Sequence, residues 1–366
     1  MSALGIINVS IVGCGGMAGQ YLNVYRDLDW VNVASCIDVN LDSAQDAARR
    51  LSAPVGTSSF DAALTKDVDA VIINTPNHLH RVQAIAAIEA GKHVLLQKPV
   101  AATVEDAEAI AHAAERSDKT IGLYMSYFDQ PLMHDIRDLI MQGYLGNLVH
   151  FYGRYMHKGG MISSARALEG TRTWRTSLDQ TGGGCFIQLA VHYIHLIEWM
   201  TGAEAVRASA FTGNLQSPGI EGEDLACALL QLNSGAVMTI DTAWCSNGEQ
   251  LSMHGTLGRI EYRNSRFLSI ASSKGAFKGR VIDYAGGIES SFDGEHGAER
   301  QMHIVPPAFD DTSNPYNQHR MFLEAVRGHK PPFCSISSGV HDLRCVRAVY
   351  DSARLGCAVD VAQPRR

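Results

Sequence analysis

The first 125 residues alternate between short apolar runs and segments with helical spacing of apolar positions, and this alternation is the strongest constraint on the fold. The apolar runs lack the polar alternation of half-exposed strands, which is typical of strands covered on both faces. Such strands separated by helices predict an α/β fold with a doubly wound parallel sheet. The strand-like runs are 7–12, 31–37, 70–74, 93–96 and 120–125, and the helical patterns between them are 17–28, 41–51, 79–90 and 103–116, with Thr103 as an N-cap.

The pattern changes after residue 125, and 366 residues exceed what one ordinary core holds. We therefore predict two domains, 1–124 and 125–366. The second is an α+β domain with a large, mainly antiparallel sheet. Residues 156–182 read as irregular, and 275–298 as a long surface loop. The helical patterns of this second domain are 134–142, 186–200, 316–328 and 338–355. Its strand-like runs are 148–155, 205–213, 225–232, 236–244, 250–256 and 259–271.

Composition excludes several classes of function. The formal net charge of -7 argues against nucleic acid or an anionic membrane as the main partner. No run of about 18 apolar residues predicts a transmembrane helix. The first twelve residues lack a basic region and a cleavage site, so we expect a cytoplasmic protein. The 8 cysteines form no Cys-x-x-Cys pair, which indicates free thiols in a reducing compartment.

A glycine-rich turn joins the first strand to the first helix. Its sequence is Gly13-Cys14-Gly15-Gly16-Met17-Ala18, which fits the Gly-x-Gly-x-x-Gly/Ala motif of dinucleotide-binding Rossmann domains. Gly13 permits the tight turn, Gly15 lets the backbone approach a pyrophosphate, and Ala18 allows close packing of helix on strand. The helix N-terminus then attracts the phosphates. The alternative is a purely structural glycine turn. The residues around the motif must therefore distinguish a dinucleotide-binding loop from such a turn.

Asp38 supplies that context. It ends the second strand, twenty positions after Ala18, where a carboxylate can accept hydrogen bonds from the adenosine ribose hydroxyls. It would also repel a 2′-phosphate, and no Arg or Lys lies between Asp38 and Arg49 to offset that repulsion. We therefore expect NAD rather than NADP as the cofactor.

Further motifs resemble one oxidoreductase family over almost the whole chain. They are Thr75-Pro76-Asn77-His78-Leu79-His80, Gln97-Lys98-Pro99, Trp174-Arg175, Gly182-Gly183-Gly184 and His192. Their succession resembles the glucose–fructose oxidoreductase, inositol dehydrogenase and rhizopine-catabolism (Gfo/Idh/MocA) family, most strongly over 7–100 and 182–202. The resemblance implies hydride transfer between NAD and a secondary alcohol or ketone of a sugar, cyclitol or related polyol. It also implies a homodimer or homotetramer.

Lys98 is the first candidate catalytic residue. The family motif is Glu-Lys-Pro, and here it reads Gln97-Lys98-Pro99. A lysine at the carboxyl end of a parallel strand points into the ligand crevice, where its ammonium group can polarise a carbonyl or stabilise an alkoxide. The resemblance implies that Lys98 contacts the reacting hydroxyl and the nicotinamide ribose, and that Gln97 contacts the cofactor. The alternative is a surface lysine with an extended side chain.

A helix of the second domain carries the other candidates. The family has Asp-x-x-x-His there, and this chain has Gln188 and His192, which share a helix face. An imidazole suits proton transfer near neutral pH, whereas Gln188 can only hydrogen-bond a neighbouring hydroxyl. His192 could instead be a buried structural residue. His195 replaces a frequent Asp of the family. Even with Cys185 earlier on the same helix, two histidines on one helix are too few ligands for a metal, so we expect no metal.

The remaining site residues come from the resemblance. Thr75, Pro76, Asn77 and His80 are expected beside the nicotinamide half of the cofactor, and Gly16 and Met17 complete the phosphate loop. Tyr127, Trp174, Arg175 and His195 are expected to contact substrate together with Lys98, Gln188 and His192. Two other functions stay open: a glycoside-cleaving enzyme that keeps NAD bound and oxidises the sugar transiently, and a non-enzymatic sensor of NAD or a metabolite.

Overall fold

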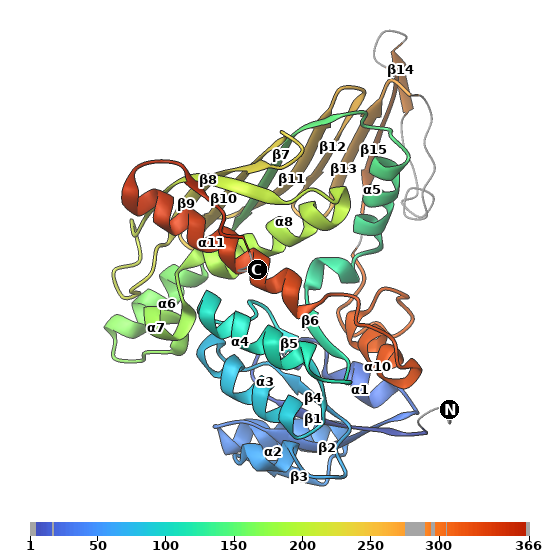
Figure 1. The fold of residues 1–366 in the computed structure, drawn as a ribbon, viewed down its shortest axis with the longest axis vertical. Coiled ribbons are helices and arrows are strands. Elements are labelled where there is room, and N and C mark those ends of the chain that lie inside the picture. Colours follow the sequence, from blue (N-terminus) through green and yellow to red (C-terminus); the bar gives the residue numbers. More distant parts are fainter. Residues whose placement is uncertain (1–4, 17, 275–289, 294–296, 305, 364–366) are drawn as a thin grey trace. The chain divides into compact units, whose positions relative to one another are not determined.

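The computed structural model describes residues 5–16, 18–274, 290–293, 297–304 and 306–363. The chain forms two compact units, whose elements are labelled in Figure 1. Unit one comprises Met1–Asp129 and Pro307–His341, and unit two comprises Gln130–Pro306 and Asp342–Arg366. Residues 307–341, which lie well beyond the predicted boundary at residue 124, thus pack with the N-terminal part of the chain.

Unit one is built on a six-stranded sheet in the order β3-β2-β1-β4-β5-β6, and every neighbouring pair is parallel. The strand order reverses between β1 and β4, and ligands of such sheets bind outside the carboxyl ends of the strands at this point. The predicted α/β class is confirmed, although the short strand β3 was not predicted. The strands are β1 (Ile7–Val12), β2 (Val31–Ile37), β3 (Val55–Thr57), β4 (Ala70–Ile73), β5 (His93–Gln97) and β6 (Ile121–Tyr124).

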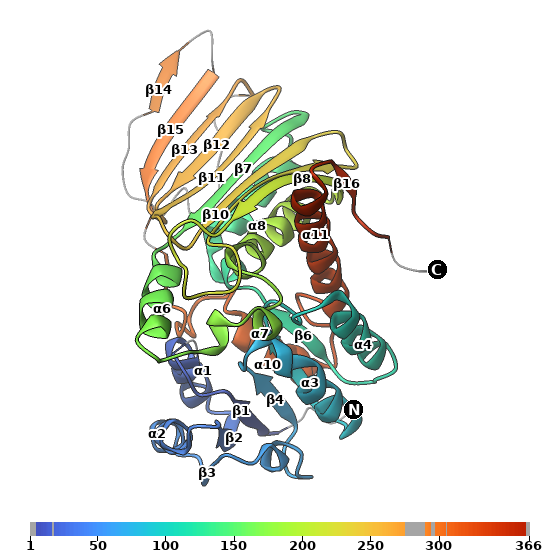
Figure 2. The same ribbon diagram turned by 90° about the vertical axis from the view of Figure 1, so that its left-hand side faces the viewer.

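Helices pack on the sheet of unit one (Figures 1 and 2). Buried residues of α1, α2 and α10 form one core with β1, while α3 packs against α4 and β5. The predicted N-cap at Thr103 is confirmed, because its side chain accepts a hydrogen bond from the amide of Asp106 at 3.1 Å. The predicted helix at 17–28 is replaced by a 3-10 turn and a shorter helix. The elements are η1 (Ala18–Gln20), α1 (Leu22–Asp27), α2 (Leu41–Leu51), η2 (Phe60–Ala63), η3 (Asn77–Leu79), α3 (His80–Glu89), α4 (Val104–Glu115), η4 (Ser126–Asp129) and α10 (Gln318–Gly328).

Unit two is built on a ten-stranded sheet in the order β14-β15-β13-β12-β11-β7-β10-β9-β8-β16. All pairs are antiparallel except β7 with β10, which confirms the predicted, mainly antiparallel sheet. The strands are β7 (Leu148–Met156), β8 (Ala205–Gly213), β9 (Leu225–Leu232), β10 (Val237–Ala243), β11 (Gly248–Gly255), β12 (Gly258–Arg263), β13 (Phe267–Ser272), β14 (Ser290–Asp293), β15 (Gly297–His303) and β16 (Val359–Asp360).

The helices of unit two include two that the sequence did not reveal. Residues 156–182 were expected to be irregular, but they contain α6 and the short α7. The run 259–271 is two strands, because Asn264 and Ser265 adopt positive φ angles and reverse the chain. Of the expected loop at 275–298, residues 275–289 and 294–296 lie outside the described part of the chain. The helices are α5 (Pro131–Met141), α6 (Gly159–Leu168), η5 (Trp174–Thr176), α7 (Leu178–Thr181) and α8 (Cys185–Thr201). Helix α11 (Ile336–Leu355) begins in unit one and continues into unit two from Asp342.

Helix α8 is the central helix of unit two. It is buried along almost its whole length and packs against β7 and β10 (Figure 2). A helix that is apolar on nearly all sides belongs in a core, so the few polar side chains on α8 are held in fixed surroundings. Among the helices that the structure describes, none is long and apolar enough to cross a membrane.

Three buried histidines of unit one predict acid sensitivity. Burial lowers the pKa of His80 and of His93 to about 4, and that of His319 to about 3. An unfolded histidine has a pKa of about 6.5. Each group therefore contributes its full stability above about pH 6.5 and loses it as the pH falls toward the folded pKa, because protons bind the unfolded chain first. At pH 5, about 1.5 units below the unfolded pKa, we expect each to have removed about 2 kcal/mol from the free energy of unfolding.

The measurement is the denaturant midpoint of unit one at pH 7.5 and pH 5. The variant His319→Gln removes one of the three buried imidazoles and should flatten the pH dependence. The matched control is His112→Gln, because His112 is exposed at the end of α4. Equal pH dependence of wild type and His319→Gln would contradict the assignment.

Candidate functional site

The glycine loop follows β1 at the point where the strand order reverses. Gly13 has a φ of +87°, and a Cβ atom there would lie 2.8 Å from the backbone of Asn74. Its amide donates a 2.7 Å hydrogen bond to the carbonyl of Ile37 on β2. Only glycine fits this turn without strain.

The next part of the loop has free space around it. Apart from the glycines and their chain neighbours, no atom of the described chain lies within 4 Å of a Cβ built at Gly15 or at Gly16, so a ligand can approach the backbone closely there. Ala18 is 1% exposed and packs into the core of unit one. Met17 lies outside the described residues. The loop thus offers the open backbone that a pyrophosphate requires.

Asp38 follows β2 directly beside this loop. One carboxylate oxygen accepts a 2.8 Å hydrogen bond from the amide of Cys14, and the other accepts one of 2.9 Å from the amide of Asn40. A carboxylate has about four acceptor positions, so two remain for ligand hydroxyls. Asp38 therefore holds the glycine loop and still has the capacity to bind a ribose. The open backbone and this carboxylate fit a dinucleotide.

A chain of polar side chains runs from the glycine loop to the end of β5. The hydroxyl of Tyr21 donates to the side-chain oxygen of Asn74 at 2.5 Å and accepts from the side-chain nitrogen of Gln97 at 3.5 Å. Gln97 in turn accepts a 2.9 Å hydrogen bond from the amide of Lys98. Burial raises the pKa of Tyr21, so its hydroxyl remains a donor. The sequence did not single out Tyr21 or Asn74.

His80 joins the two loops that follow β4 and β5. It is fully buried, with one ring nitrogen 2.8 Å from the carbonyl oxygen of Thr75 and the other 3.0 Å from that of Pro99. Because burial lowers the pKa of His80 to about 4, the ring is neutral and donates to only one of these carbonyls at a time. His80 thus hydrogen-bonds the backbone of one loop or the other, beside the cis Lys98–Pro99 peptide.

The other residues predicted for the cofactor lie in the same segment. Pro76 precedes η3, and Asn77 is 2% exposed. The hydroxyl of Thr75 donates a 2.5 Å hydrogen bond to the side chain of Gln83 on α3. Tyr127 lies buried in η4, also in unit one. These positions surround the carboxyl ends of β4, β5 and β6.

In unit two, Gln188, His192 and His195 lie on one face of α8. The spacings of four and three residues place them in one row, and each is only 6–7% exposed. A ring nitrogen of His195 lies 2.8 Å from a carboxylate oxygen of Asp342 on α11. This pairing orients the His195 ring, and nothing in the local sequence indicated Asp342. The ring of Tyr155 lies 6.3 Å from that of His192.

The glycine triplet before α8 has a packing role. A Cβ atom on Gly184 would lie 2.0 Å from the backbone oxygen of Glu223, and one on Gly183 would lie 2.1 Å from the hydroxyl of Tyr350. The half-buried Glu223 carboxylate accepts 2.8 Å hydrogen bonds from the amides of Gly184 and Phe186, and one of 2.9 Å from Tyr350. A carboxylate at a helix N-terminus is stabilising, so Glu223 fixes the start of α8 and thereby the row of polar residues on it.

Trp174 and Arg175 lie together on η5. The Arg175 guanidinium sits 4.4 Å from the centre of the Trp174 ring, which is a cation–π contact. Arg175 is exposed and Trp174 half-buried.

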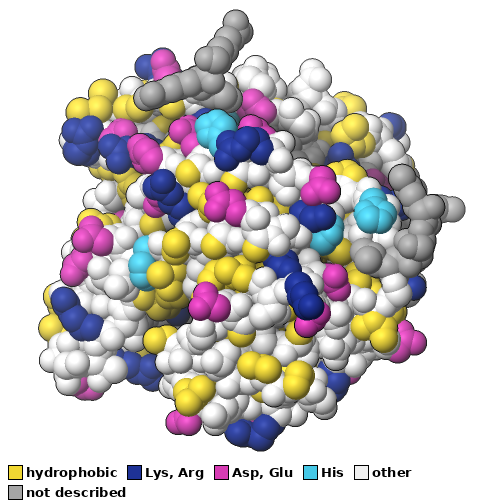
Figure 3. All heavy atoms as spheres, turned by 60° about the horizontal axis from the view of Figure 1, so that its bottom comes forward, with side chains coloured by type: hydrophobic (Ala, Val, Ile, Leu, Met, Phe, Trp, Pro, Cys, Tyr) yellow, Lys and Arg dark blue, Asp and Glu magenta, His cyan; other side chains and the backbone are white. Residues whose placement is uncertain are grey.

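On the face drawn in Figure 3, basic side chains are interspersed with acidic ones, which agrees with the small net charge of the chain.

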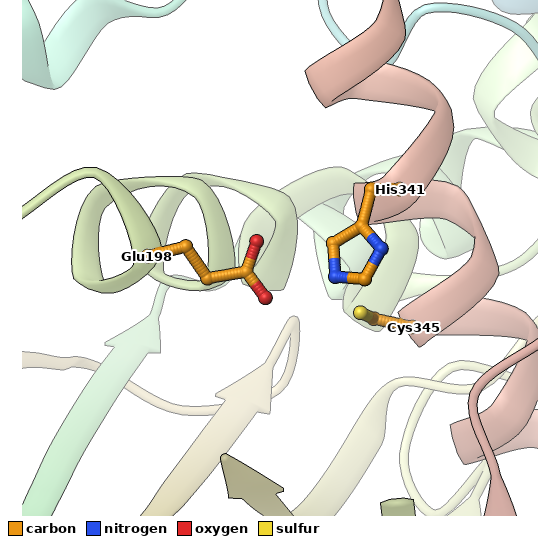
Figure 4. Close-up of side chains that lie close together, drawn as sticks. All are labelled: Glu198, His341 and Cys345. Atoms are coloured by element: carbon orange, nitrogen blue, oxygen red, sulfur yellow. The ribbon is translucent and has the colours of Figure 1, made fainter. Parts of the chain in front are cut away.

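One group of three potential metal ligands occurs among the described residues. Ligand atoms of Glu198, His341 and Cys345 lie within 4.8 Å of one another (Figure 4). Three side chains are one fewer than a closed structural zinc site requires. The group therefore carries no metal assignment.

Models of one oxidoreductase family match both parts of the chain. The model described as "Oxidoreductase family, NAD-binding Rossmann fold" matches residues 7–125, and the model of the "GFO/IDH/MocA C-terminal domain" matches residues 133–261.

Named relatives and solved structures match as well. The chain is 28% identical over 301 residues to 1,5-anhydro-D-fructose reductase from Ensifer adhaerens, covering 81% of this chain and 80% of the relative. It is 24% identical over 361 residues to D-apiose dehydrogenase from Paraburkholderia graminis, covering 96% and 89%. A solved structure of levoglucosan dehydrogenase in complex with NADH superposes with a TM-score of 0.82 at 22% identity, over 98% of this chain and 99% of the other. At that identity, the superposition shows a shared fold.

Proposed function

This chain belongs to the Gfo/Idh/MocA family of oxidoreductases, and we propose that it is an NAD-dependent dehydrogenase acting on a secondary alcohol of a small sugar, cyclitol or related polyol. One observation supports this most directly. The open backbone at Gly15 and Gly16, the Asp38 carboxylate and Lys98 all follow carboxyl ends of strands in one parallel sheet. Relatives named for reactions of anhydrofructose and apiose support the sugar or polyol class.

The bound nicotinamide would accept or supply the hydride. The Lys98 ammonium would hydrogen-bond the reacting oxygen of the substrate. It would stabilise the negative charge that develops on that oxygen as the hydroxyl proton leaves. His192 would take that proton, and Gln188, one turn earlier on α8, would bind a neighbouring hydroxyl. His195, oriented by Asp342, would bind another polar group of the substrate. Tyr127, Trp174 and Arg175 complete the proposed substrate contacts.

The direct test of the function is cofactor reduction. Purified protein is incubated with NAD and a panel of sugars and inositols, and NADH formation is followed by its absorbance. We expect turnover with at least one polyol and a preference for NAD over NADP. Binding of NAD without turnover on any polyol would favour a sensor instead. We also propose that the protein is cytoplasmic and that it forms a homodimer or homotetramer. Light scattering in solution would test the oligomeric state.

Asp38→Ala should weaken NAD binding selectively. A hydrogen bond to a charged group contributes about 1.5–3 kcal/mol, so we expect NAD affinity to fall about 10- to 100-fold. NADP binding should be unchanged or stronger, because the repulsion of its 2′-phosphate is removed. Calorimetric titration with both cofactors measures the ratio.

Two further variants separate binding from loop structure. Asp42→Ala removes an exposed carboxylate four residues later, on α2, and should leave the ratio unchanged. Asp38→Asn retains one acceptor for the amide of Cys14 and should preserve the loop while still losing the discrimination. An unchanged NAD/NADP ratio in Asp38→Ala would show that Asp38 is only a turn residue.

A further inference from the structure

Tyr21 lies at the centre of the hydrogen-bonded chain that joins the glycine loop to the end of β5. It directly precedes α1 and is only 1% exposed. Its ring stacks on that of His319 from α10, with 4.0 Å between the ring centres, and the ring of Tyr124 lies 5.6 Å away. This packing fixes the ring, and the hydroxyl reaches two side chains, those of Asn74 after β4 and Gln97 at the end of β5.

The half of this chain nearer the glycine loop has a single arrangement of protons. The carbonyl of Gly13 can only accept, and it accepts a 3.4 Å hydrogen bond from the side-chain nitrogen of Asn74. The side-chain oxygen of Asn74 therefore faces Tyr21, whose hydroxyl donates its one proton to that oxygen at 2.5 Å. The Tyr21 oxygen is left as an acceptor for the next member of the chain.

The other half of the chain ends at the backbone of Lys98. The amide of Lys98 can only donate, and it donates to the side-chain oxygen of Gln97 at 2.9 Å. The side-chain nitrogen of Gln97 therefore faces Tyr21 and donates to its oxygen at 3.5 Å. A carboxylate in place of this amide could not donate to Tyr21. Five residues thus form one directed series of hydrogen bonds, in which every donor and acceptor is determined by the two backbone groups at its ends.

We propose that Tyr21 is a positioning residue of the dehydrogenase reaction: it fixes the side chain of Gln97, and through Gln97 it holds Lys98 in place relative to the glycine loop. The inference rests on the proposed function, in which Lys98 contacts the reacting oxygen and the glycine loop binds the cofactor. Groups that act on one reacting centre must be held to within about 0.5 Å of their productive positions. Tyr21 needs no contact with substrate for this role, because it acts only through Gln97 and Lys98.

The kinetic experiment is a double-variant cycle between Tyr21 and Lys98. Tyr21→Phe removes the hydroxyl and keeps the stacked ring. At saturating NAD, its kcat should fall about tenfold, because a displacement of about 1 Å can cost up to about 10² in rate. In Lys98→Ala, the same substitution should change kcat by less than about twofold, because the positioned group is already absent. Losses that multiply in the double variant would overturn the proposal, because Tyr21 would then act elsewhere than through Lys98.

Hydrogen exchange of the Lys98 amide tests the same contact without turnover. This amide is bound to Gln97, and Pro99, which follows it, has no amide hydrogen. Once Tyr21 no longer holds Gln97, the amide should exchange at least about fivefold faster, because local opening costs less. Unchanged exchange in Tyr21→Phe would overturn the proposal. Wild type that oxidises no polyol would contradict the proposed function, and the exchange rate would still decide whether Tyr21 holds Lys98.

The matched control is Tyr25→Phe. Tyr25 is also 1% exposed, and its hydroxyl lies 2.5 Å from a ring nitrogen of His319, outside the hydrogen-bonded chain. Its loss should lower the thermal midpoint but leave kcat and the exchange of the Lys98 amide as in wild type. An equal fall of kcat in Tyr25→Phe would overturn the proposal, because general loosening of this core would then explain both variants. If Tyr21→Phe does not fold, Gln97→Met breaks the chain at its next member and should give the same kinetic cycle with Lys98→Ala.

Discussion

Replacing Lys98 with alanine will lower kcat/KM for the polyol substrate by about a thousandfold. Removal of one preorganised donor to a developing oxyanion costs about 10²–10³ in rate, and Lys98 also carries a full positive charge. Its backbone is firmly held, because its amide donates to Gln97 and the following Pro99 carbonyl contacts His80. The side chain therefore starts from a fixed position, and its loss should change the chemistry rather than the fold. Steady-state kinetics with NAD and the best polyol measure the effect.

Controls separate this role from a general charge effect. Lys66→Ala removes an exposed lysine of the same unit and should leave kcat/KM unchanged. The thermal midpoint of Lys98→Ala should match that of wild type, and its NAD affinity should change far less than its turnover. Full activity in Lys98→Ala would defeat the proposed mechanism, because no other cation is assigned to the reacting oxygen.

The part of the fold that the sequence predicted depends on local patterns. Unbroken apolar runs predicted five of the six parallel strands. The glycine motif predicted the tight turn between strand and helix, where the structure gives Gly13 a positive φ angle. Asp38 could be proposed as a cofactor residue because its distance from the loop is set by one strand–helix–strand unit. Each of these patterns lies within a short segment of the chain, so it can be recognised in a single sequence.

Contacts distant in sequence could not be predicted in the same way. Tyr21, Asn74 and Gln97 form one hydrogen-bonded chain across three segments, and no spacing rule links them. The contacts of Glu223 and Asp342 with α8 could not be predicted either, because both residues are far from the helix in sequence. The packing of residues 307–341 in unit one is also set by tertiary contacts. Helix α6 was missed because Gly159, Gly160 and its serines are weak helix formers, which packing overrides.

His192→Ala should reduce kcat about 10²- to 10⁴-fold, the range that a positioned acid–base group contributes. The substitution also truncates a buried side chain of α8 that is only 6% exposed. Loss of stability must therefore be distinguished from loss of proton transfer. Added imidazole makes that distinction, because it can enter the vacated space and restore part of the turnover only if the missing function is chemical. The pH dependence of kcat should lose the limb that the imidazole causes in wild type.

The alternative for His192 is a structural histidine, and it predicts a different set of results. In that case, His192→Ala would lower the thermal midpoint, added imidazole would not raise kcat, and the pH profile of the remaining activity would keep its shape. His254→Ala is the matched control, because His254 is a half-buried histidine on β11 of the same unit. Its kcat and pH profile should equal those of wild type. Gln188, one turn before His192, cannot accept a proton in its place, and a variant that retains full activity would rule out this imidazole as the base.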